Sequence, residues 1–100
     1  MEDPEQVSEA VIVWSGFRAE AWPHRDERRL VEVFGAALAA QLLAVVKRLE
    51  DEFYESDARF TAPDLKTMGD AAAERFRSLH PELSDSAVKA LAWCYIFDYK

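Results

Sequence analysis

The feature that most constrains the fold is a long run in which apolar residues recur every three or four positions. The recurring residues are Leu30, Phe34, Leu38, Leu42, Val45 or Val46, Leu49 and Phe53. This spacing places them on one face of an α-helix. Asp26 and Glu27, near its start, suit the positive end of the helix dipole. We therefore expect one long central helix over about residues 25–55, with the small residues around Gly35 allowing close approach of a neighbouring backbone.

Two further helices are expected before and after this run. Asp3 can cap a short helix that begins at Pro4 and ends at Gly16, although "VIVW" within it is also compatible with a β-strand. Thr61, followed by an acid three residues later, forms a capping-box pattern for another helix. That helix should end just before Pro81, because a residue preceding proline is pushed out of helical angles.

The final segment, "LAWCYIFDYK", has aromatic residues two apart, which is the spacing of a strand face. Ser84 is a good N-cap, and Leu83 and Val88 stand at the positions of a hydrophobic staple. This start signal favours a C-terminal helix over about 85–99. Sixteen alanines also favour helix. We expect an all-α fold, a small bundle of three to four helices around the long central one, in a single domain over residues 1–100.

The charge of the chain excludes several classes of partner. The formal net charge is −7, so nucleic acid and anionic membrane surfaces should repel it and a basic protein should attract it. The longest uncharged run, 33–46, is too short to span a bilayer, and the acidic start does not resemble an export signal. We expect a cytoplasmic protein, and the abundance of alanine and arginine suggests a bacterial source.

The sequence gives no reason to expect a catalytic, metal or cofactor site. His24 and His80 lie in different connections, and the single cysteine, Cys94, stands in an apolar stretch that would keep its thiol protonated. No glycine-rich phosphate loop is present. An enzyme is therefore the least favoured class of function.

The most informative feature is an acidic segment at the end of the long helix. It consists of Glu50, Asp51, Glu52, Glu55 and Asp57, with Phe53 and Tyr54 among them. Acids at this negative end of a helix dipole are mildly destabilising. Acids around an aromatic anchor are typical of a surface that binds a basic protein, although a solvated helix end would show the same charges. We expect a non-catalytic protein-binding module, an inhibitor or regulator of a basic partner. In size, acidity and helical content the chain is similar to small acidic immunity proteins and antitoxins, but this similarity assigns no residue.

Two alternatives remain open. A homodimer with a structural role could form through the alanine-rich helix or the C-terminal aromatics, and the residues concerned are Ala36, Ala37, Ala40, Trp93 and Phe97. A weaker alternative is a pocket for a small anionic ligand. Its lining would be Trp14, Arg18, Trp22 and Arg25.

Overall fold

The computed structural model describes residues 3–100, and the elements in this range are all helical. They are α1 (Pro4–Ser15), α2 (Glu27–Phe34), α3 (Ala36–Phe53), the single-turn α4 (Ala58–Thr61), α5 (Leu65–Leu79) and α6 (Asp85–Tyr99). The all-α prediction is confirmed, and the C-terminal helix lies where it was expected. The strand interpretation of "VIVW" is wrong, because these residues lie in α1.

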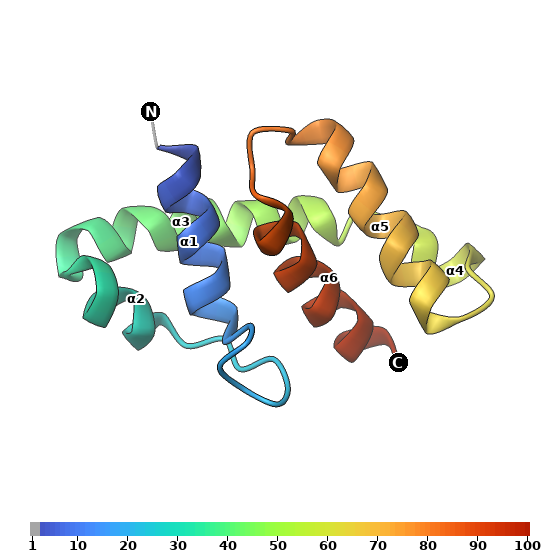
Figure 1. The fold of residues 1–100 in the computed structure, drawn as a ribbon, viewed down its shortest axis with the longest axis horizontal. Helices are drawn as coiled ribbons and strands as arrows, with labels where there is room; N and C mark the ends of the chain where they lie inside the picture. The colour runs from blue at the N-terminus through green and yellow to red at the C-terminus, as the bar shows by residue number, and fades with distance from the viewer. Residues whose placement is uncertain (1–2) are drawn as a thin grey trace.

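The helices form a flat particle of 42 × 28 × 18 Å. The shortest dimension matches two layers of helices, since one helix with its side chains is about 10 Å across. Figure 1 shows α3 running along the long axis, with α1 crossing it and α6 lying between α1 and α5. The short α2 turns back beside the start of α3. The single-turn α4 and part of α3 contact α5.

The single long helix predicted over about 25–55 is interrupted at Gly35. This residue has φ 83° and ψ 157°, a backbone conformation that is essentially open only to glycine. A Cβ added there would meet nothing within 4 Å, so the conformation rather than a close approach requires glycine. The break lets α2 fold back and bury Leu30, which a straight helix would carry away from the core.

The predicted ends of α1 and α6 are confirmed in detail. The Asp3 carboxylate accepts a hydrogen bond from the Glu5 N–H at 3.1 Å, and Gly16 ends α1 in the left-handed conformation with φ 79°. Ser84 Oγ caps α6 by accepting from the Ala87 N–H at 3.1 Å. The Ser84 N–H donates to Ser8 Oγ at 2.9 Å, which fixes the start of α6 against α1.

The helix after the acidic segment begins later than its capping-box pattern predicts. Its N-cap is Asp64, whose carboxylate accepts from the Thr67 N–H at 2.7 Å. Thr61 instead ends α4, because Ala62 precedes a proline and is held extended, with ψ 142°. The predicted end is confirmed, since His80 caps α5.

Aromatic side chains from three helices fill the core where α3, α5 and α6 meet. Phe53 lies 5.1 Å from Phe76 and 5.5 Å from Tyr95, measured between ring centroids. All three are fully buried. This cluster determines how the end of α3 sits against α6. Among the described helices, none combines the length and apolar character needed to cross a bilayer.

We predict that Gly35→Ala lowers the free energy of unfolding by about 1–3 kcal/mol, the cost of forcing a non-glycine residue into this conformation. Urea unfolding followed by circular dichroism would measure the change. An unchanged or increased stability would show that α2 and α3 can join without loss.

Candidate functional site

The acidic segment is not one continuous surface in the structure. Three of its five acids form ion pairs with distant segments: Glu50 with Arg25 at 2.5 Å, Glu52 with His80 at 2.5 Å, and Glu55 with Arg75 at 3.7 Å. Glu50 and Glu52 are partly buried, while Asp51, Glu55 and Asp57 are exposed. These three face solvent, and Glu55 also makes the 3.7 Å contact to Arg75.

The aromatic residues within the segment are not exposed anchors either. Phe53 is fully buried in the core, so the suggestion that it could anchor a partner is wrong. Tyr54 is half-buried, and its hydroxyl donates to Asp98 Oδ2 at 2.5 Å and accepts from Arg25 Nη2 at 2.8 Å. Both side chains stabilise the fold at this end of α3.

A different aromatic residue is exposed on the short helix that follows the exposed acids in the chain. Phe60, on α4, has 76% of its surface exposed, the largest fraction among the exposed large apolar residues. Its N–H donates to the carbonyl of Asp57 at 2.9 Å, so the ring stands one turn beyond that exposed acid. We call Asp51, Glu55, Asp57 and Phe60 the acidic corner; Figure 1 places α4 at the far end of α3.

The backbone of the acidic corner is held from inside the core. Tyr95 is fully buried on α6, and its hydroxyl donates to the carbonyl of Ser56 at 3.0 Å while accepting from the Arg59 N–H at 3.0 Å. Ser56 Oγ accepts from the Ala58 N–H at 3.2 Å. Buried polar groups must find partners, so these bonds fix the turn between α3 and α4.

The Arg59 side chain completes the support of Phe60. Its Nη1 donates to the carbonyls of Tyr54 at 2.9 Å and Ser56 at 3.0 Å. Its guanidinium carbon lies 4.5 Å from the centroid of the Phe60 ring and 4.8 Å from that of Tyr99. The guanidinium thus holds the exposed ring through a cation–π contact and restricts its motion.

Phe60, the one residue of the acidic corner outside the acidic segment, was not predicted from the sequence. "ESDARFTAP" looks like a connection, and nothing in it marks Phe60 as part of a short helix. The one available signal was Phe60 itself, an aromatic residue in a segment that also contains acids and a proline. Turn segments of this kind are usually occupied by polar residues. The support from Tyr95 comes from 36 residues away and could not be read from local sequence.

A polar network on the other side of Tyr54 joins three segments. Arg25 donates to Glu50 on α3 and, at 2.8 Å, to Asp98 on α6. Burial opposes the charge of Arg25, but nearby Cys94, Glu50 and Asp98 outweigh it and raise the guanidinium pKa. Burial, and then the hydrogen bond to Asp98, raise the pKa of Tyr54. Both groups therefore keep their protons at neutral pH and act as fixed donors.

Cys94 is fully buried next to this network. Burial raises the pKa of its thiol to about 12. A nucleophilic cysteine needs the thiolate, so at neutral pH this thiol is inert.

The residues predicted for self-association are exposed or partly exposed, but the structure does not bring them together. Ala36, Ala37 and Ala40 lie exposed at the start of α3, while Trp93 and Phe97 lie on α6. Figure 1 separates these two segments along the long axis of the molecule.

The four residues suggested for a ligand pocket do not form one pocket. Trp14 and Arg25 line one hollow, with Arg25 5.8 Å from the Trp14 ring. Trp22 lines another hollow, with Trp93 and Phe97. Arg18 donates to Ser86 Oγ at 3.1 Å.

Within residues 3–100, no three histidine, cysteine, aspartate or glutamate side chains converge in a way that could hold a metal ion. The comparisons with known proteins assign no family: no family model, curated protein or solved structure matches this chain.

We predict that Tyr95→Phe lowers the free energy of unfolding by about 1–3 kcal/mol, because the Arg59 N–H and the Ser56 carbonyl lose their buried partner. Tyr99→Phe is the matched control, since no hydrogen bond of its hydroxyl is found in the described part of the chain, and it should change stability by less than about 0.5 kcal/mol. Urea unfolding measures both. Equal effects would show that the Tyr95 hydroxyl does not support the corner.

We also predict that stability falls as the pH rises above about 9. The unfolded thiol of Cys94 ionises near its ordinary pKa of 9.0, while the folded thiol keeps its proton to about 12. The native state therefore binds more protons in this range, and the free energy of unfolding decreases with pH. Cys94→Ala should show a shallower decrease between about pH 9 and 12. An identical slope in the variant would contradict this assignment.

Proposed function

We propose that this chain is a non-catalytic protein-binding module that recognises a basic protein surface through the acidic corner. The observation that carries the proposal is the exposure of Phe60 on a turn that the core holds in place. Covering a large exposed aromatic side chain with a partner removes its apolar surface from water, which is favourable. Aromatic residues of this kind commonly supply the main binding energy of an interface.

The charges around Phe60 favour a basic partner. Asp51, Glu55 and Asp57 are exposed, and the chain as a whole carries −7. Arg75 approaches Glu55 only to 3.7 Å, a weak pair between exposed side chains. A basic partner would be drawn by the whole field of the chain and oriented by these three acids.

The pre-organisation of the corner supports inhibition or regulation as the outcome of binding. The α3–α4 turn is fixed by the Tyr95 hydroxyl and by the guanidinium of Arg59. A surface already in its bound conformation loses little entropy on association. Tight, lasting occupation of a basic site is what an inhibitor requires.

We predict that Phe60→Ala weakens binding to the natural partner by about thirtyfold, which corresponds to about 2 kcal/mol for a residue at the centre of an interface. The partner would first be captured from lysate of cells that naturally contain the chain. Its affinity would then be measured with purified proteins by calorimetry. Leu79→Ala, on another exposed apolar residue, is the matched control and should leave the affinity unchanged.

The role of charge is tested by a triple reversal of Asp51, Glu55 and Asp57 to lysine. Glu50 and Glu52 are left intact because they hold Arg25 and His80. Reversing Glu5, Glu9 and Glu32 to lysine changes the net charge equally at exposed positions elsewhere. We expect the first variant to lose binding and the second to keep most of the affinity and its salt dependence. Equal losses would show that total charge alone attracts the partner.

A further inference from the structure

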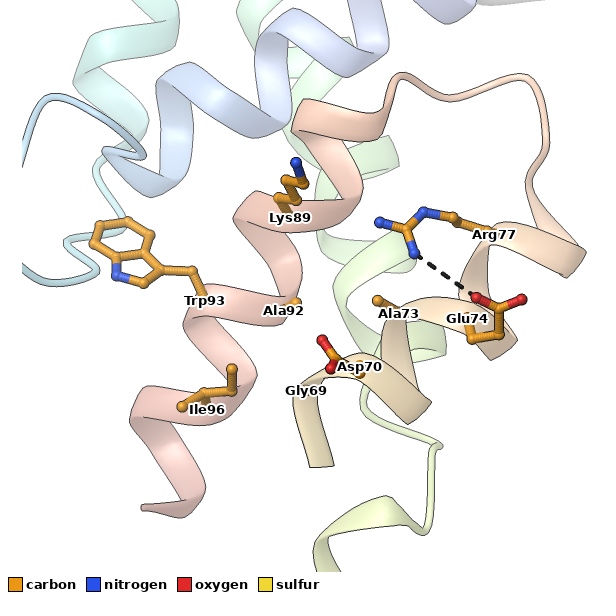
Figure 2. Close-up of a pocket in the computed structure, with 9 residues that line it drawn as sticks. All are labelled: Gly69, Asp70, Ala73, Glu74, Arg77, Lys89, Ala92, Trp93 and Ile96. Atoms are coloured by element: carbon orange, nitrogen blue, oxygen red, sulfur yellow. Dashed lines mark ion pairs between the residues drawn. The ribbon is translucent and has the colours of Figure 1, made fainter. Parts of the chain in front are cut away.

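A second surface, distinct from the acidic corner, lies between α5 and α6. Figure 2 shows a groove between these helices, of about 410 Å³. Its apolar lining is Gly69, Ala73, Ala92, Trp93 and Ile96. A Cβ on Gly69 would lie 2.4 Å from Cδ1 of Ile96, so a larger residue there would displace the Ile96 side chain that lines the groove.

A smaller hollow of about 280 Å³ lies on the other side of the same α6 residues. Trp93 and Ile96 line both hollows, so they form a ridge between them. Trp22, 63% exposed, and Phe97, 38% exposed, stand at the smaller hollow. We call Trp22, Trp93, Ile96 and Phe97 the aromatic face. The aromatic face thus carries an apolar ridge, Trp93 and Ile96, beside two hollows. On a second copy of the chain, the same ridge could enter one of these hollows.

The charges at the groove are balanced, unlike those of the chain as a whole. Its charged lining consists of two acids, Asp70 and Glu74, and two bases, Arg77 and Lys89. Lys100 lines the smaller hollow. Two copies that each carry −7 repel one another, and they meet at the lowest electrostatic cost where the local charge is close to zero. A basic partner, in contrast, gains little from this surface.

The positions of these charges also suit a two-fold arrangement. The α5 side of the groove carries two acids, Asp70 and Glu74, and one base, Arg77, and the α6 side carries Lys89 (Figure 2). A two-fold axis parallel to the groove places the α5 edge of each copy over the α6 edge of the other. In such an isologous interface the α5 edge of each copy, where acids outnumber bases, faces Lys89 on the α6 edge of the other.

We propose that the aromatic face and the α5–α6 groove form the interface of a symmetric homodimer, with the Trp93–Ile96 ridge of each copy packed against the groove of the other. None of these residues belongs to the acidic corner, so the dimer does not depend on the function proposed for that corner. The dimer would present two acidic corners to a partner.

Sedimentation equilibrium of the purified chain, from low micromolar to high micromolar concentration, tests this proposal. We expect a mass approaching twice the 11.4 kDa of the chain. Phe97→Glu should raise the dimer dissociation constant at least about tenfold, by burying an unpaired charge in the interface. Trp93→Glu should do the same, with retained helical circular dichroism showing that the fold survives. Because Trp93 also packs 5.6 Å from Phe17, Phe97→Glu is the decisive variant.

Val33→Glu is the matched control, since Val33 is an exposed apolar residue on α2, away from the groove. It should leave dimerisation unchanged, as should Phe60→Ala. A monomer throughout the concentration range would overturn the proposal. So would a dimer that Val33→Glu disrupts and Phe97→Glu does not, since its interface would then lie on α2 and α3.

Discussion

The hydroxyl of Tyr95 is the polar group that fixes the α3–α4 turn, and the acidic corner is built on this turn. It is fully buried among aromatic rings, with Tyr54 and Tyr99 at 5.2 and 4.9 Å between centroids. A buried hydroxyl without partners would be costly, and here both partners are backbone groups of the α3–α4 turn. The core and the acidic corner are therefore one structural unit: the packing that stabilises α6 also sets the direction of Phe60.

Arg25 has a comparable role for the long connection between α1 and α2. The connection is anchored where the His24 and Asp26 N–H groups donate to the carbonyls of Ser15 and Trp14, each at 3.0 Å. From this position Arg25 reaches α3 and α6 together. The acid that seemed free in the sequence, Glu50, is thus part of the fold, and the same holds for Glu52 beside His80. What remains for a partner is a smaller and more exposed set of charges.

The parts of the fold that local chemistry determines could be predicted from the sequence, and the parts that distant contacts determine could not. The caps at Asp3 and Ser84, the stop at Gly16 and the apolar periodicity all act within one helical turn. The break at Gly35 was missed because one glycine costs an alanine-rich helix only about 1 kcal/mol, and the gain from burying Leu30 becomes visible only once α2 folds back. Phe53 and Phe60 are the same residue type beside the same acids, and only the tertiary structure distinguishes the buried ring from the exposed one.

In the proposed complex, Phe60 of the acidic corner contacts a basic protein directly. A photo-cross-linking amino acid placed at position 60, in cells that naturally contain the chain, tests this contact where it would occur. The same residue at the exposed position 44 of α3 is the reference. We predict that position 60 captures a basic protein that position 44 does not. The same adducts from both positions, or none from position 60, would contradict the claim.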